Sequence, residues 1–172
     1  RLVGLRRIHF VAAVGHEIGT GHKYRCQHLG RVLSHHDLSW EVFGNVRQRH
    51  SPADVTVFDC LEVPTERLLE AKSHGKVVVL EDEGAESGRL ADLRVNEMLD
   101  PNDLKYAVLR EEFCCLPPRE HYEQGRRVLV AFGGTDQAGL AKRVDRVLSF
   151  GSDESPEWSV GVIRPEDNVS MA

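Results

Sequence analysis

The feature that most constrains the fold is a short apolar run, residues 8–14, which leads into a glycine-containing loop and then a helical pattern. Such a run is typical of a buried parallel strand. In the loop, Gly19 and Gly21 let backbone N–H groups approach a ligand, and the helix N-terminus behind them favours negative charge. His22 then places a base beside a phosphate-sized anion site. The alternative is a tight turn in which Thr20 is a capping residue and His22 lies on the helix surface.

One helical turn after His22, Arg25 lies on the same face of the expected helix. It could hold an anion, position a carboxylate or remain solvated. The glycine spacing differs from the dinucleotide-binding fingerprint and from the P-loop. No Gly-x-Ser-x-Gly elbow is present, which argues against a Ser-His-Asp hydrolase.

Strand-like and helical segments alternate along most of the chain. The clearest strand is residues 76–80, and the helix before it has Pro64 near its first position and Gly75 at its stop. This alternation predicts an α/β fold with a parallel sheet. The expected strands are residues 8–14, 40–44, 54–59, 76–80, 128–132 and 158–163, with weaker extended segments at 91–99 and 106–110, and the expected helices are residues 22–34, 64–72 and 138–150.

A charged, proline-containing stretch at residues 117–127 predicts a boundary between an N-terminal domain, 1–118, and part of a second domain, 126–172. The second part repeats the plan of strand, glycine loop and helix, but it is too short to bury a full α/β core by itself. Because the chain begins at Arg1 and stops as a new segment starts, we interpret it as a fragment of a longer protein.

Composition excludes several functional classes. The net charge is −5, from 22 Lys and Arg against 27 Asp and Glu, so no overall field favours nucleic acid. No apolar run approaches the roughly 20 residues that span a bilayer. The apolar run within residues 1–15 is too short for a signal peptide and continues directly into the loop. We therefore expect a cytoplasmic protein with no nucleic-acid partner and no transmembrane segment.

The four cysteines do not form a recognisable disulfide framework. Cys114 and Cys115 are adjacent, and no Cys-x-x-Cys spacing exists for zinc. We expect these two, together with Cys26 and Cys60, to be reduced and partly buried thiols. The nine histidines also lack the spacing of a metal site, so we expect no metal and no other cofactor.

Two further groups of residues lie at the ends of expected strands, where open α/β sheets bind ligands. Asp59 and the acidic run 81–83 follow two such strands, and Asp82 is our preferred functional carboxylate among them. A solvated acidic loop is the alternative. The other group is the turn 133–136, Gly-Gly-Thr-Asp, which offers free amides and a helix cap or is simply a well-capped turn.

Several ordered blocks resemble one known family. The loop reads Gly-x-Gly-His-x-x-Arg-Cys over residues 19–26, and this segment resembles the start of the PseG-like nucleotide-sugar hydrolases. These are relatives of the MurG-type GT-B glycosyltransferases and include the SpsG-like spore-coat polysaccharide proteins. Further blocks in the family's order are VTVFDCL at 55–61, KVVVLEDEG at 76–84, KYAVLREEF at 105–113, VLVAFGGTD at 128–136 and the start of an Asn-Met helix at 165–172.

The resemblance implies two Rossmann-like domains that face a cleft, and a monomer that hydrolyses a UDP-linked diacetamido-trideoxy sugar to UDP and free sugar. His22 would activate water. Gly19 and Gly21 would lie near the diphosphate or sugar, with the segment Gly133, Gly134 and Thr135 opposite. The family's later nucleotide-binding block, a glycine-rich loop with a glutamate, is missing from this sequence. The alternatives are a GT-B glycosyltransferase that uses a UDP-sugar donor, or a non-catalytic remnant that binds nucleotide sugars.

Overall fold

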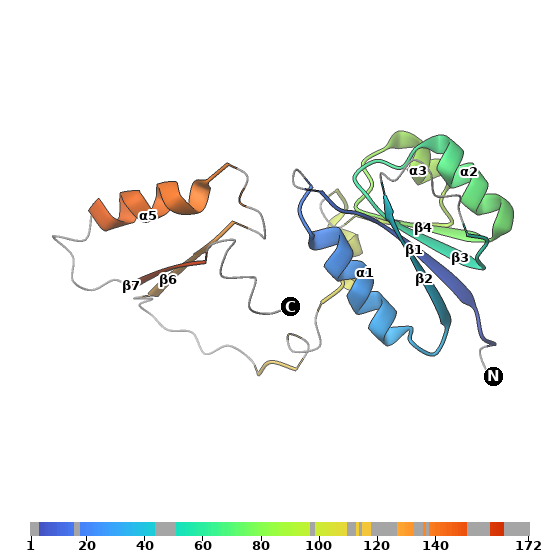
Figure 1. Cartoon of the computed structure of the whole chain (residues 1–172), viewed down its shortest axis with the longest axis horizontal. Helices are drawn as coiled ribbons and strands as arrows, with labels where there is room; N and C mark the ends of the chain where they lie inside the picture. The colour runs from blue at the N-terminus through green and yellow to red at the C-terminus, as the bar shows by residue number, and fades with distance from the viewer. Residues whose placement is uncertain are drawn as a thin grey trace. The chain divides into compact units, whose positions relative to one another are not determined.

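The computed structural model (Figure 1) describes residues 4–15, 18–43, 51–96, 99–109, 113, 115–117, 127–132, 136, 138–150 and 159–163. The chain divides into two compact units. The first comprises Arg1–Val14 and His22–Cys114, and the second comprises Gly15–Gly21 and Cys115–Ala172. Each unit has its own parallel sheet.

The first unit is built on a five-stranded parallel sheet in the order β2-β1-β3-β4-β5. Its strands are β1 Arg7–Ala13, β2 Asp37–Phe43, β3 Val55–Asp59, β4 Lys76–Leu80 and β5 Leu93–Val95. The chain passes from β1 to β2 on one side and then crosses back to β3 on the other side of β1. In open α/β sheets, ligands bind in the crevice outside the carboxyl ends of the strands at such a reversal.

Helices cover both faces of this sheet (Figure 1). Helix α1, Gly21–Val32, lies on one face, and α2, Thr65–His74, and α3, Ala85–Leu90, lie on the other. Side chains of β1 alternate between the faces: Phe10 shares an apolar cluster with Cys26 of α1, and Val11 shares the other with Leu68 of α2. The sheet therefore has two buried faces and is Rossmann-like in kind, which confirms the predicted parallel α/β fold.

The second unit contains a parallel pair of strands and one helix: β6 Arg127–Ala131, β7 Ser159–Ile163 and α5 Leu140–Phe150. Asp136 caps the start of α5. Its carboxylate accepts the backbone N–H of Leu140 at 2.8 Å and that of Ala141 at 2.9 Å. Acceptors at this position satisfy amides that have no partner within the helix. The contacts agree with the capped turn that the sequence suggested.

Most predicted elements are confirmed to within a few residues, and β4 matches its prediction at both ends. β2 begins at Asp37 rather than at residue 40. The extended segment expected at 91–99 is only the three-residue β5, and residues 107–109 belong to no strand. Helix α3 and the 3-10 turn Pro101–Tyr106 were not expected, since both are too short to show a helical periodicity. The predicted boundary at 118–126 lies outside the described residues.

Gly75 separates α2 from β4 in a place that has no room for a side chain. A Cβ there would lie 2.4 Å from the carbonyl oxygens of Ala53 and Asp54, and these backbone atoms lead into β3. We predict that Gly75→Ala lowers the free energy of unfolding by roughly 1–3 kcal/mol, because the segments before β3 and β4 must separate. Urea denaturation measures this. Gly4→Ala is the control, since no atom lies within 4 Å of that Cβ; equal stabilities of the two variants would contradict the steric account.

Candidate active site

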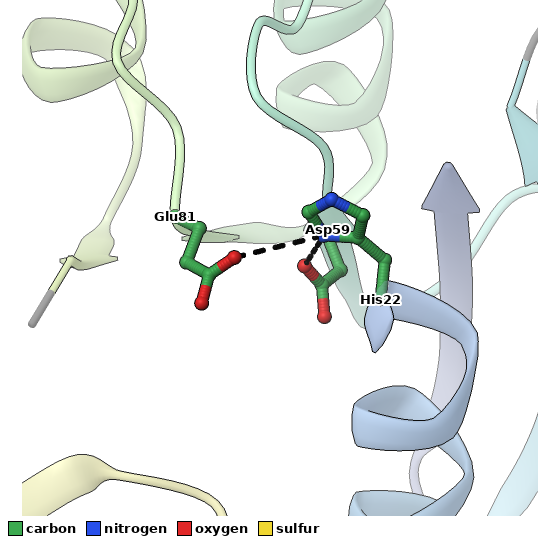
Figure 2. Close-up of side chains that lie close together, drawn as sticks. All are labelled: His22, Asp59 and Glu81. Atoms are coloured by element: carbon green, nitrogen blue, oxygen red, sulfur yellow. Dashed lines mark hydrogen bonds and ion pairs between the residues drawn. The ribbon is translucent and has the colours of Figure 1, made fainter. Parts of the chain in front are cut away.

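Three side chains converge at the carboxyl edge of the first sheet, beside the reversal of strand order. His22 is the second residue of α1, Asp59 ends β3 and Glu81 follows β4. His22 Nδ1 lies 2.6 Å from Asp59 Oδ1 and 3.9 Å from Glu81 Oε2, as the dashed lines in Figure 2 indicate. Because β3 pairs with both β1 and β4 in parallel, the sheet itself brings these segments to one edge.

Arg25 joins the two carboxylates. Its Nε donates to Asp59 Oδ2 at 2.7 Å, its Nη2 donates to Asp59 Oδ1 at 2.6 Å, and its Nη1 donates to Glu81. A bidentate pair of this kind is strong and fixed in orientation. Burial alone would lower the pKa of Arg25, but the two carboxylates raise it on balance, so the guanidinium stays charged. Asp59 is completely buried, and the positive charge of Arg25 offsets the cost of burying its negative charge.

The structure thus uses Arg25 to position carboxylates. The sequence also allowed it to bind a substrate by holding an anion, or to remain solvated. Its side chain is only 16% exposed, and all three of its nitrogens donate to Asp59 or Glu81. A phosphate would have to compete with both carboxylates for this guanidinium. The geometry therefore favours an orienting role over direct substrate binding.

The contact between His22 and Asp59 determines which ring nitrogen carries the proton. An ionised carboxylate can only accept hydrogen bonds. Nδ1 lies 2.6 Å from Asp59 Oδ1 and 3.2 Å from Arg25 Nη2, which itself donates to Asp59 Oδ1 at 2.6 Å. The shorter contact with the carboxylate favours the tautomer in which Nδ1 carries the proton and donates to that oxygen. Nε2 of the neutral ring is left with a lone pair. Among the residues that the structure describes, none forms a hydrogen bond with Nε2, so this atom is the one that can accept a proton from a ligand.

The four residues His22, Arg25, Asp59 and Glu81, called the His22 cluster below, carry two negative charges and one positive charge when the imidazole is neutral. This balance favours an incoming proton or cation over an anion. His22, Asp59 and Glu81 each offer one atom to a metal ion, and these atoms lie within 4.8 Å of one another. Such an ion would have to displace the guanidinium of Arg25 from both carboxylates. The arrangement fits a proton better than a metal.

Glu81 has an unusual backbone conformation. Its φ is 55°, in the left-handed region that non-glycine residues seldom adopt. Its N–H donates to Val95 O at 2.9 Å, which holds the backbone at the end of β4. The conformation directs the carboxylate to Arg25 at the edge of the site. Strain of this kind is tolerated where surrounding contacts fix the residue, and it is common at functional sites.

Asp82, the carboxylate that the sequence favoured, has a structural position instead. It is fully buried. Its Oδ2 accepts the N–H of Val63 at 2.9 Å, and its Oδ1 accepts the N–H of Gly84 at 2.7 Å and the hydroxyl of Ser87. These contacts fix the loop before α3 and leave the carboxylate engaged on both oxygens. Binding of a substrate by Asp82 stays a prediction, and the acidic neighbours at the strand ends, Asp59 and Glu81, are the carboxylates that contact His22.

The glycine loop before α1 is partly described. Gly19 has a φ of 83° and its N–H donates to Gly15 O at 2.8 Å, so this position requires a residue without a Cβ. Thr20 is half-buried, and Gly21 begins α1 with open space where a Cβ would lie. These features suit a loop that exposes amides, but binding of a substrate by Gly19, Thr20 and Gly21 stays a prediction. The segment Gly133, Gly134 and Thr135 lies outside the described residues.

Comparisons with known proteins do not assign the chain to a family. No family model, no curated protein and no solved structure matches it. Within the described part of the chain, no helix is long and apolar enough to cross a membrane.

Two cysteines near this cluster are predicted to be unreactive in the folded protein. Burial raises the pKa of Cys60 to about 12, with a further contribution from the charge of Asp59. Burial and Asp59 also raise the pKa of Cys26. Iodoacetamide at pH 8 should label the exposed Cys115 at least about a hundredfold faster than either, since the thiolate is the nucleophile. Peptide mapping by mass spectrometry measures this, and rapid native-state labelling of Cys26 or Cys60 would contradict their burial. Cys114 lies outside the described residues.

Proposed function

We propose that this chain is a nucleotide-sugar hydrolase, or part of one, that releases UDP from a UDP-linked diacetamido-trideoxy sugar. The observation that carries the proposal is the hydrogen bond between His22 Nδ1 and the buried Asp59, which leaves Nε2 as a proton acceptor at the ligand-binding edge of the sheet. The substrate class comes from the resemblance of the sequence blocks to the PseG-like hydrolases.

In the proposed reaction, water attacks the anomeric carbon of the sugar. A new C–O bond forms, the bond between the sugar and UDP breaks, and UDP leaves with the electron pair of that bond. Nε2 of His22 accepts the proton of the attacking water, and Asp59 stabilises the imidazolium that results. Arg25 holds Asp59 in the orientation that this requires. A positioned base of this kind typically contributes about 10²–10⁴-fold to the rate.

The charge of the His22 cluster also bears on where the diphosphate binds. Because the cluster is negative when His22 is neutral, a diphosphate is repelled from its immediate surroundings. We infer that backbone amides of the loop formed by Gly19, Thr20 and Gly21 hold it instead. We also propose, from the same resemblance, that the protein is a cytoplasmic monomer with two Rossmann-like domains in a GT-B arrangement.

The functional prediction is that UDP release depends on the His22–Asp59 pair. His22→Gln should lower kcat by about 10²–10⁴-fold, and Asp59→Asn by a similar factor, because the amide no longer selects the required tautomer. His28→Gln, also on α1 but in contact with Arg31 rather than with a carboxylate, is the matched control and should leave kcat unchanged. UDP release from UDP-sugars is followed chromatographically.

Each other outcome overturns part of the proposal. Undiminished turnover in His22→Gln would show that His22 is not the general base. UDP release that required an added sugar acceptor would assign a glycosyltransferase that uses the same base on an acceptor hydroxyl. Calorimetric binding of UDP-sugars without turnover would assign a non-catalytic binding module.

A further inference from the structure

A second cluster of histidine and carboxylate lies on the opposite face of the sheet from α1. It consists of His9 on β1, Ser39 and Glu41 on β2, and Arg67 on α2, and is called the His9 cluster below. His9 and Ser39 are direct partners in the β1–β2 register, and Glu41 is two residues further along β2 on the same face. None of these residues belongs to the His22 cluster.

The contacts form a chain from hydroxyl to imidazole to carboxylate. Ser39 Oγ lies 2.8 Å from His9 Nδ1, and His9 Nε2 lies 3.2 Å from Glu41 Oε2. Arg67 Nη2 donates to the other oxygen of Glu41 at 2.7 Å. His9 is 3% exposed and Glu41 is 7% exposed, whereas Ser39 is exposed. The base and its carboxylate are therefore protected from solvent, and the hydroxyl is accessible.

The carboxylate of Glu41 again indicates which ring nitrogen of His9 carries the proton. The carboxylate of Glu41 pairs with Arg67 and, as a carboxylate, can only accept, so the geometry favours the tautomer in which His9 Nε2 carries the proton and donates to it. His9 Nδ1 then has a lone pair, and the hydroxyl of Ser39 donates its proton to that lone pair. This is the order of groups that activates a serine for nucleophilic attack, with the two ring nitrogens exchanged relative to the serine proteases.

We propose that Ser39 is a nucleophile activated by His9 and that it accepts an acyl group from an ester. Ser39 Oγ attacks the ester carbonyl carbon as its proton passes to His9 Nδ1. A new bond forms between Oγ and the carbonyl carbon, the ester C–O bond breaks, and the alcohol leaves with the proton from His9. This activity is independent of the proposed hydrolysis of UDP-sugars.

The edge position of β2 suits this role. Within the part of the chain that the structure describes, β2 pairs only with β1, so alternate backbone N–H groups of β2 face away from the sheet. Amides of this kind are the donors that stabilise the oxyanion of an acyl-transfer intermediate. The N–H of Asp37 donates to Arg6 O, so by alternation the N–H of Ser39 faces β1 and the outward donors are those of its two neighbours on the strand. Ser39 therefore has an accessible hydroxyl and a buried base, and it is flanked by residues whose amides face outward.

The test is acetylation of the chain by p-nitrophenyl acetate, mapped by proteolysis and mass spectrometry. Ser39 should be acetylated at least tenfold faster than Ser34 and Ser51, which are exposed serines in the same chain. His9→Gln should reduce acetylation of Ser39 at least tenfold, because the base is lost. Acetylation of Ser39 no faster than that of the two control serines would overturn the proposal.

A second variant keeps the test decisive if His9→Gln fails to fold. In Ser39→Cys, the introduced thiol would donate to His9 and form a thiolate readily. Iodoacetamide should alkylate it at least tenfold faster than the exposed Cys115 of the same molecule. An introduced thiol that reacts no faster than Cys115 would show that His9 does not activate position 39, and the cluster would then only join β1, β2 and α2.

Discussion

The bidentate pair between Arg25 and Asp59 is the interaction on which the candidate site depends. Asp59 is completely buried at the end of a central strand, where an unpaired carboxylate would be very unfavourable. Arg25 satisfies both of its oxygens and also holds Glu81. Removing one partner of a buried pair typically costs about 3–5 kcal/mol. The orientation of His22 follows from this pair, because Arg25 holds the carboxylate of Asp59 where its Oδ1 meets Nδ1 of the imidazole.

The sequence was sufficient to predict the sheet and half of the His22 cluster. Apolar runs and their spacing located β1, β3 and β4, and the helical spacing of His22 and Arg25 placed both on one face of α1. Parallel strands with helices between them then required the residues after each strand to gather at one edge. These predictions needed only local patterns and general rules of α/β topology.

The choice of carboxylate could not be made in the same way. Asp82 directly follows Glu81, yet the two carboxylates have different partners. Glu81, whose φ is 55°, contacts Arg25, whereas Asp82 fixes the loop before α3. Backbone conformation at a strand end depends on tertiary contacts that sequence periodicity does not contain. Asp59 was a better candidate on position alone, since it ends β3, and β3 is adjacent to β1, the strand that precedes His22. The His9 cluster was missed because His9 and Ser39 meet only through the β1–β2 register.

The most direct measurement of the central claim is the tautomer of His22, from ¹⁵N NMR of the histidine side chains at neutral pH. The account predicts that the neutral ring carries its proton on Nδ1, which donates to Asp59, and that Asp59→Asn abolishes this preference. A native protein in which neutral His22 carries its proton on Nε2 would contradict the account, because the atom proposed to accept a proton would already hold one.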